Sequence, residues 1–84
     1  MTVKVLFFSV LRDLVGAEHL PLSLEAGGGR VVLREILARL YNDYPALQSW
    51  DSSLLLAVNA EFATRESLVH DGDEIALMPP VQGG

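Results

Sequence analysis

The chain has 84 residues, half of them hydrophobic, with no cysteine and a formal net charge of −5. This length supports one domain with a single modest core, and this hydrophobic content excludes a disordered chain. The lack of cysteine excludes disulfides, a thiolate nucleophile and cysteine-based metal sites, and it is compatible with a protein of the reducing cytoplasm.

The net charge is unevenly distributed along the chain. Residues 1–50 carry five acidic and five basic side chains, whereas residues 51–84 carry six acidic side chains against Arg65 alone. This pattern disfavours nucleic acid as a partner, because contacts to phosphates need a basic face. It favours a protein partner with a basic groove, although ordinary solubilising charge would give the same distribution.

The apolar run near the N-terminus predicts a strand, Val3–Phe8, because it is rich in β-branched and aromatic residues. The run is stopped by charged residues and lacks a small-residue cleavage site, so we interpret it as part of a soluble domain. Lys4 marks the outer face of the strand, and alternation then places Leu6 and Phe8 on that same face.

A short helix and an edge strand are expected next. Ser9 is expected to cap the helix and Gly16 to end it. Residues 19–24 alternate leucine with other residues, which predicts a half-buried strand, and Pro21 places that strand at an edge because proline cannot donate to a ladder. The glycines at 27–29 form a flexible connection, since no Lys-Ser/Thr pair follows them to make a phosphate loop.

The main helix is predicted over Val31–Tyr44, before Pro45, which ends it. Apolar residues recur there at i, i+3, i+4, i+7, i+8 and i+11, which predicts a core-facing side rather than a cofactor site. The residues of this stripe are Leu33, Ile36, Leu37, Leu40, Tyr41 and Tyr44. Residues 46–53 are expected to form a polar loop that holds the only tryptophan, Trp50.

Two further strands are predicted in the second half of the chain, Leu54–Asn59 and Glu74–Met78. Alternation directs five of their side chains inward: Leu54, Leu56, Val58, Ile75 and Leu77. It directs five others outward: Leu55, Ala57, Glu74, Ala76 and Met78. Between these strands we expect a short strand near Phe62, a core contact from Leu68 in a loop, and a tight turn in which Gly72 supplies the positive φ.

The outward-facing apolar side chains form one predicted surface, the sheet patch: Leu6, Phe8, Leu55, Ala57, Ala76 and Met78. A contiguous apolar area of this kind on a monomer marks an interface. The alternative is that a loop covers the patch, and the loop that holds Trp50 is the obvious candidate.

The residues of a self-sufficient active site cannot be assembled from this sequence. The two histidines, His19 and His70, are expected at surface or turn positions. Asp71 and Asp73 flank a turn glycine, but the pattern is too short for a calcium loop. No Ser-His-Asp arrangement can be inferred either, so the sequence favours a substrate-like carrier over an enzyme.

The last six residues form a tail after a domain that we place at residues 1–78. Pro79 and Pro80 fix φ and cannot continue a ladder, while Gly83 and Gly84 have no Cβ and can thread a narrow channel. The only reactive group of the tail is the Gly84 carboxylate, which becomes an acyl donor once it is activated. We hypothesise that this carboxylate is the functional group; a frayed chain end is the alternative.

Three segments together resemble the MoaD/ThiS family of ubiquitin-like sulfur carriers, which includes the small subunit of molybdopterin synthase. They are residues 4–16, the strand ending Ala57-Val58-Asn59, and residues 71–84 with their Asp-Gly-Asp-Glu and Pro-Pro-Val-x-Gly-Gly sequences. The resemblance implies an α+β fold, the β-grasp: a mixed sheet of about five strands, with the first and last strands parallel and one main helix packed on one face. Met78 departs from the pattern, since relatives often carry an aromatic residue before the prolines.

The resemblance also implies a function. The Gly84 carboxylate would be adenylated by a ubiquitin-activating-type adenylyltransferase that uses ATP and magnesium, and then converted to a thiocarboxylate. Its sulfur would pass to cyclic pyranopterin monophosphate in the large subunit of molybdopterin synthase, within a heterotetramer, and no cofactor would be bound by the chain itself. Besides the sheet patch, the partner-binding residues would be Pro79, Pro80, Val81 and Gln82, with Gly83 and Gly84 at the reacting end.

Other functions stay open at this point. Carriers for thiamine, cysteine or tRNA thiolation use the same Gly-Gly chemistry, although the proline pair and the longer helix-loop region favour molybdopterin. A ubiquitin-like modifier conjugated to lysines and a β-grasp binding module with an inert tail are the remaining alternatives. Whether the chain counts as an enzyme is also open, because it would act only as the sulfur-donating subunit of one.

Overall fold

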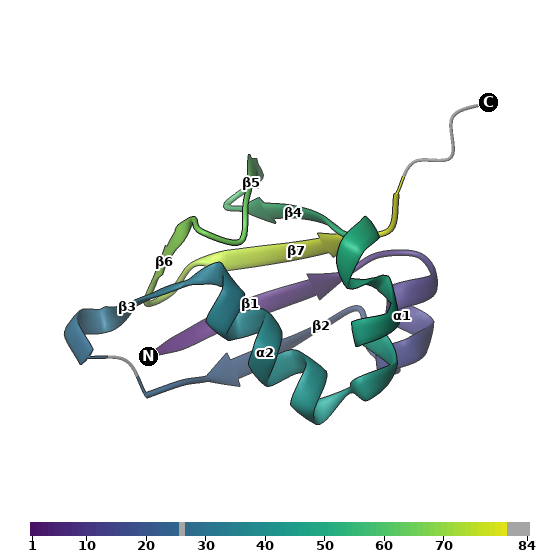
Figure 1. The fold of residues 1–84 in the computed structure, drawn as a ribbon. Coiled ribbons are helices and arrows are strands. Elements are labelled where there is room, and N and C mark those ends of the chain that lie inside the picture. Colours follow the sequence, from purple (N-terminus) through teal and green to yellow (C-terminus); the bar gives the residue numbers. More distant parts are fainter. Residues whose placement is uncertain (26, 81–84) are drawn as a thin grey trace.

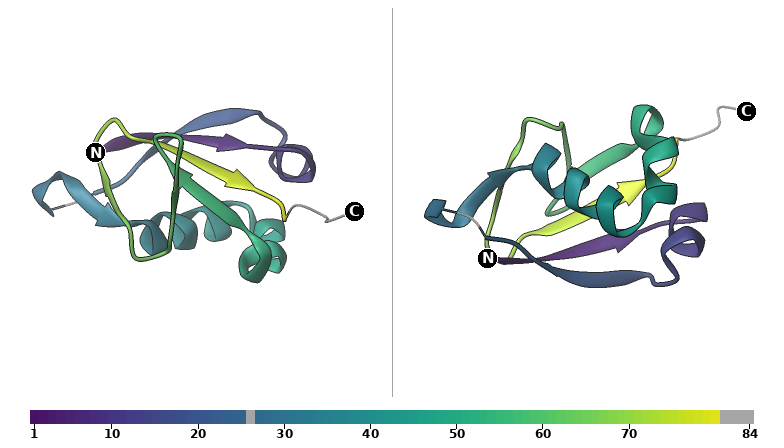
Figure 2. Two further views of the ribbon diagram at one scale, coloured as in Figure 1. Left: turned by 90° about the horizontal axis from the view of Figure 1, so that it is seen from above. Right: turned by 60° about the horizontal axis from the view of Figure 1, so that its bottom comes forward.

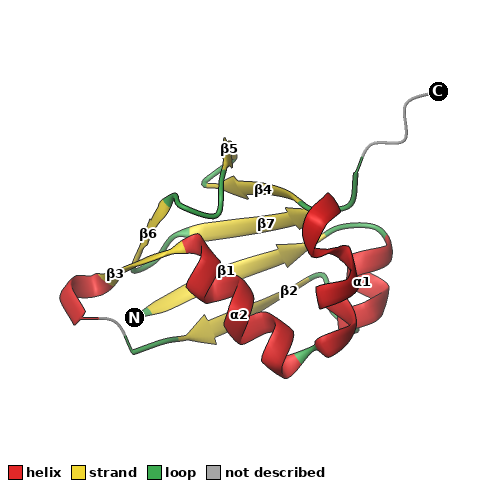
Figure 3. Ribbon diagram, in the orientation of Figure 1, coloured by secondary structure: helices red, strands yellow, loops and turns green. Residues whose placement is uncertain are grey.

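A five-stranded sheet forms the centre of the computed structural model, which describes residues 1–25 and 27–80. Figures 1 and 3 show the strands in the order β2-β1-β7-β4-β5. In that order the strands are His19–Ser23, Thr2–Phe7, Glu74–Met78, Leu55–Val58 and Glu61–Ala63. The neighbours β1 and β7 run parallel and the other pairs antiparallel, so the mixed β-grasp sheet is confirmed. Pro21 of β2 lies on an edge strand, as predicted.

The two longest helical segments lie over one face of this sheet. The main helix α2 (Leu33–Asp43) and the 3-10 helix η2 (Pro45–Ser53) pack on that face, and α1 (Val10–Val15) follows the end of β1. The left view of Figure 2 shows α2 and η2 on the same side, and no described helix lies over the opposite side. We call the covered side the core face and the opposite side the outer face.

The apolar stripe of α2 packs into the core as its periodicity predicts. Leu33, Ile36, Leu37 and Leu40 are each at most 2% exposed, and Tyr41 is partly buried against them. They meet inward-facing side chains of the sheet, including Val5, Phe7, Leu56, Ile75 and Leu77. The strand side chains on this face are therefore confirmed as core residues.

Leu37→Ala is expected to lower the free energy of unfolding by about 2–5 kcal/mol, because it removes buried methyl groups and leaves a cavity. Glu35→Ala, an exposed change on the same helix, is the matched control and should shift stability by less than about 0.5 kcal/mol. Urea denaturation followed by circular dichroism measures both. Equal midpoints for wild type and Leu37→Ala would show that this helix face does not pack in the core.

The main helix begins two residues later than predicted. Residues Arg30–Val32 form a strand, β3, that pairs antiparallel with β6 (Leu68–His70) in a separate two-stranded sheet. The two valines before Leu33 have the β-branched side chains that suit this extended backbone. The first helical N–H group, that of Leu33, donates to the Ser67 carbonyl at 2.9 Å, so the β5–β6 loop stabilises the start of the helix.

The prediction that Leu68 fills the core from a loop is wrong. Leu68 is 49% exposed, and its neighbour Val69 is fully buried instead. The reason is that this segment is a strand rather than a loop, so its side chains alternate between the two faces. Val69 lies opposite Val31 of β3 in the pairing, and only one of the two faces meets the core.

Two other local predictions need correction. Residues 45–53 form a 3-10 helix rather than a polar loop, with Pro45 in its first turn and Leu47 fully buried. Ser9 makes no side-chain hydrogen bond at the start of α1; its backbone adopts φ 53° and ψ −130°, and its carbonyl accepts the Arg12 N–H at 3.0 Å. The predicted ends of helix and turn are confirmed, because Gly16 and Gly72 have φ of 83° and 86°.

Asp51, in η2, connects three parts of the core face. It accepts a hydrogen bond from the Tyr41 hydroxyl of α2 and lies 3.0 Å from a guanidinium nitrogen of Arg65 in the β5–β6 loop. These two contacts hold the pKa of Asp51 below its usual value. Burial, followed by the bond to Asp51, raises the pKa of the Tyr41 hydroxyl. Arg65, the single basic residue of residues 51–84, therefore forms an ion pair within the domain.

Candidate functional site

Large side chains border small ones on the outer face where β1, β7 and β4 lie side by side. The pairing register places Leu6 of β1 beside Ala76 of β7, and Ala76 beside Ala57 of β4. The chain continues past Phe7, and the Phe8 N–H donates to the Leu77 carbonyl at 3.3 Å. This bond prolongs the β1–β7 pairing and places Phe8 next to the last residues of β7.

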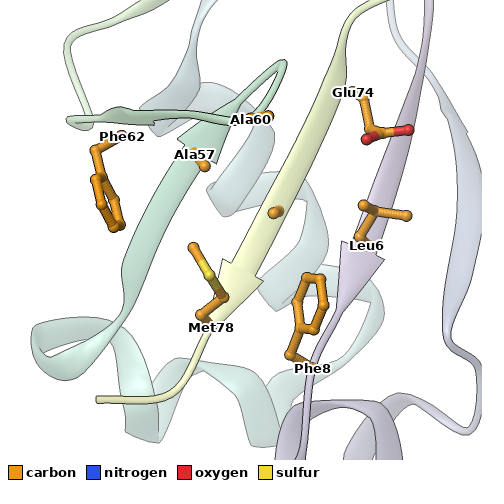
Figure 4. A pocket seen from close by; sticks show the side chains of 8 residues that line it. Leu6, Phe8, Ala57, Ala60, Phe62, Glu74 and Met78 are labelled. Carbon is orange, nitrogen blue, oxygen red and sulfur yellow. The ribbon is translucent and has the colours of Figure 1, made fainter. Parts of the chain in front are cut away.

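These strands surround a depression of about 250 Å³, the outer hollow. Its lining residues are Leu6, Phe8, Ala57, Ala60, Phe62, Glu74, Ala76 and Met78. Figure 4 shows the large side chains of Phe8, Met78 and Phe62 around alanines, with Glu74 at the opposite end from Phe8. The hollow exists because alanine, at the centre of the sheet, leaves space that the larger neighbours enclose.

Most of the predicted sheet patch comes together in this hollow, but Leu55 does not line it. Leu55 pairs with Met78 on the same face of the sheet. Ala57 also faces outward as predicted, yet it is only 7% exposed because larger neighbours screen its single methyl group. The alternative prediction, that the segment with Trp50 covers the sheet patch, is not met. Trp50 packs against the core and does not line the hollow.

Phe62 is the largest part of the hollow that sequence reasoning missed. It is 83% exposed, whereas Phe8 is 45% exposed. A two-residue turn at Asn59 and Ala60, both with positive φ, joins β4 to β5 and pairs Ala57 with Phe62. With a two-residue turn at 59 and 60, Val58 pairs with Glu61 and Ala57 pairs with Phe62. Paired residues of a hairpin lie on the same face, so this turn would have predicted Phe62 on the outer face.

The end of the hollow near Glu74 is held by a network around Asp73. The Asn59 side-chain amide donates to Asp73 Oδ1 at 3.0 Å, and the His70 backbone N–H donates to Asp73 Oδ2 at 2.8 Å. The Glu74 backbone N–H in turn donates to Asn59 Oδ1 at 3.0 Å. The bond from Asn59, followed by that from His70, lowers the pKa of Asp73 below its usual value.

Acidification is expected to destabilise the fold through Asp73. Because the folded state lowers this pKa, its stabilising contribution is complete above the unfolded value of about 3.9 and is lost as pH falls through the folded value. Asp73→Asn should therefore remove part of the loss in stability below about pH 4.

Thermal unfolding measured against pH checks this expectation, with the exposed Asp13→Asn of α1 as control. The Asp73→Asn curve should have a shallower acid slope than both the wild-type curve and the control curve. An Asp73→Asn curve with the wild-type acid slope would contradict a role for this carboxylate.

The tail leaves the sheet directly beside the outer hollow. Met78 ends β7 and lines the hollow, and the half-buried Pro79 and Pro80 follow it. The remaining predicted site residues, Val81, Gln82, Gly83 and Gly84, lie outside the described residues.

The described residues contain no group of three or more side chains suited to hold a metal ion. None of the helices in the described ranges is long and apolar enough to cross a membrane. The described residues place an apolar hollow at the end of β7, where Met78 is followed by Pro79 and Pro80.

Comparison with known proteins adds to this geometry. A model of the ThiS family matches residues 5–84. The molybdopterin synthase sulfur carrier subunit of Haemophilus influenzae is 40% identical over 82 residues, which cover 98% of this chain and 99% of that protein.

Two solved structures resemble the fold over the whole chain. SAMP1 from Haloferax volcanii matches with a TM-score of 0.83 and 26% identity, and all of both chains is covered. A chain in the complex of subunits 1 and 2 of the molybdopterin-converting factor from Helicobacter pylori matches with a TM-score of 0.68 and 27% identity, again over all of both chains.

Proposed function

The chain belongs to the ThiS family, and we propose from this membership and from the similarity to molybdopterin synthase sulfur carrier subunits that it is a sulfur carrier for molybdenum cofactor biosynthesis. The observation that carries the proposal is that the family match extends to the last residue, Gly84. The last strand, β7, ends at Met78, which lines the apolar hollow and stands six residues before Gly84 in the sequence. A carrier needs such a combination, a surface by which partners hold the domain and a reactive group at a fixed reach from that surface.

The proposed reaction uses the Gly84 carboxylate as an acyl group. A ubiquitin-activating-type adenylyltransferase transfers AMP from ATP, with magnesium, to this carboxylate and releases pyrophosphate. Sulfide-level sulfur from a donor then displaces AMP and forms a thiocarboxylate, whose sulfur passes to cyclic pyranopterin monophosphate. The chain contributes no general acid or base of its own to these steps, because its role is to present the tail to the active sites of its partners.

The large subunit of molybdopterin synthase is the proposed acceptor partner, in a heterotetramer with two copies of each subunit. Support comes from the similar chain of Helicobacter pylori, which was solved as a complex of subunits 1 and 2 of the molybdopterin-converting factor. The outer hollow is the proposed contact surface, because a contiguous apolar area that includes two exposed phenylalanines is unfavourable in water. The cytoplasm is the proposed compartment.

Intact-mass spectrometry tests the proposal. The chain is incubated with the activating enzyme, ATP, magnesium and a sulfur donor, and a carrier gains the mass difference between sulfur and oxygen. Addition of the large subunit and cyclic pyranopterin monophosphate should return the mass to that of the carboxylate. A thiocarboxylate that persists under those conditions would instead indicate a carrier for another pathway, such as thiamine, cysteine or tRNA thiolation.

A second candidate function is a protein modifier joined to lysines. The observation in its favour is the full-length similarity to SAMP1 from Haloferax volcanii, whose relative from Methanosarcina acetivorans is described as a small archaeal modifier protein. In the same mass experiment, carried out with cell extract, a modifier would appear as adducts on other proteins. The two outcomes are distinguishable by mass. Conversion to a thiocarboxylate changes the mass of the chain only by the difference between sulfur and oxygen, whereas conjugation adds the mass of a second protein.

A further inference from the structure

We propose that Lys4 is an acyl-acceptor site on this chain, and that acylation there by the activated C-terminus of a second copy switches off the accepting copy. This inference rests on the proposed function, because that function requires an activated Gly84 carboxylate. An acyl adenylate reacts with any accessible amine, so a carrier of this kind is exposed to its own chemistry.

The sequence leaves only one side chain that can accept such an acyl group as an amine. Of the six basic residues, Lys4 is the single lysine and the other five are arginines. Guanidinium groups stay protonated in proteins and are poor acyl acceptors, whereas a lysine amine is a common target of acylation. Acylation of side-chain amines on this chain is therefore confined to one position.

The other primary amine, at Met1, is held by the fold. Its nitrogen donates to the Leu24 carbonyl at 2.8 Å in a partly buried contact, and the Leu24 N–H donates back to the Met1 carbonyl at 2.8 Å. The Met1 side chain also packs against the core. In contrast, the Lys4 side chain is 51% exposed, so the lysine is the more accessible of the two amines.

Lys4 does not line the outer hollow itself, but it lies next to Glu74, which does. It stands beside Glu74 in the parallel pairing of β1 with β7, and its Nζ is 4.0 Å from a carboxylate oxygen of Glu74. Among the residues that the structure describes, Glu74 is the only charged one that lines the hollow. An acyl group on Nζ would remove the positive partner of Glu74 and place its bulk next to the surface proposed to bind partners.

The reaction balances without an oxidant or a reductant. The Lys4 ammonium first gives one proton to water, and the lone pair of the neutral Nζ then attacks the carbonyl carbon of Gly84 in the acyl adenylate of a second copy. An amide bond forms, the bond between the acyl carbon and the AMP oxygen breaks, AMP leaves, and a second proton passes from Nζ to water. The accepting copy then carries a whole domain beside its outer hollow, so neither partner can reach that surface.

The first experiment identifies the acceptor. The chain is incubated with the activating enzyme, ATP and magnesium but no sulfur donor, and the products are analysed by intact mass and peptide mapping. We expect a two-copy product with its branch at Lys4, and loss of this product in Lys4→Arg, which keeps the positive charge beside Glu74. A branch at Met1, or the same yield from Lys4→Arg, would overturn the proposal.

The second experiment tests the switch with a polyethylene glycol N-hydroxysuccinimidyl ester, which acylates amines with a bulky group. Its matched control is the double variant Lys4→Arg, Arg30→Lys, which moves the single lysine to an exposed position on β3, outside the five-stranded sheet. Labelled wild type should lose thiocarboxylate formation, whereas the labelled double variant should keep it. Equal conversion by both labelled proteins would overturn the switch.

These outcomes are separable from failure of the proposed function. If unlabelled wild type forms a thiocarboxylate but no two-copy product, the carrier function stands and the acceptor site is refuted. If unlabelled wild type forms neither an adenylate nor a thiocarboxylate, the carrier function itself fails.

Discussion

Deletion of Gly84, or addition of one residue after it, is expected to abolish thiocarboxylate formation and to leave the unfolding midpoint unchanged. Adenylation requires the carboxylate to reach the nucleotide from a fixed docking position, and one residue changes that reach by up to about 3.6 Å. A misplacement of about 1 Å can already cost about a hundredfold in rate. The last residues of a domain, in contrast, contribute little to its stability. Intact mass and thermal unfolding measure the two effects separately.

Gly83→Val is the matched variant, because it keeps the length of the tail and the terminal carboxylate. It should also fail to form a thiocarboxylate, since a β-branched side chain widens the tail and restricts φ where glycine does not. Conversion of either the truncated chain or Gly83→Val at the wild-type rate would show that reach and width of the tail do not limit the reaction.

Sequence reasoning succeeded where one physical rule determined the local structure. The stripe of α2 follows the helical period, and the strands alternate between a face with Ile75 and Leu77 and a face with Ala76 and Met78. The end of α1 at Gly16 and the turn at Gly72 follow from the positive φ that glycine tolerates. The β-grasp topology came from the resemblance, because periodicity does not specify which strands are neighbours.

The errors arose where two segments distant in sequence determine each other. Val31 could continue a helical pattern, but pairing with Val69 of β6 makes it extended. The same pairing decides that Leu68 points away from the core. Phe62 was placed only approximately, because its face depends on the register of a hairpin whose turn contains neither Asn-Gly nor Asp-Gly.

Phe62→Asp and Phe8→Asp are expected to keep the domain folded and to weaken binding to both the activating enzyme and the large subunit. Each partner must hold the domain so that the same short tail reaches its own active site, and the outer hollow lies where that tail begins. Removal of an apolar anchor from the centre of an interface commonly costs about 2 kcal/mol or more, which is about thirtyfold in affinity. A buried aspartate adds a desolvation cost to that loss.

Leu14→Asp is the control, because Leu14 of α1 is 38% exposed and does not line the outer hollow. Calorimetric titration with each partner should give wild-type affinity for this variant and weakened affinity for the two phenylalanine variants. A shared surface also makes the two partners compete, so the large subunit should displace the chain from the activating enzyme in a pull-down. Wild-type binding by both folded phenylalanine variants, or a stable ternary complex, would show that the outer hollow is not the common contact.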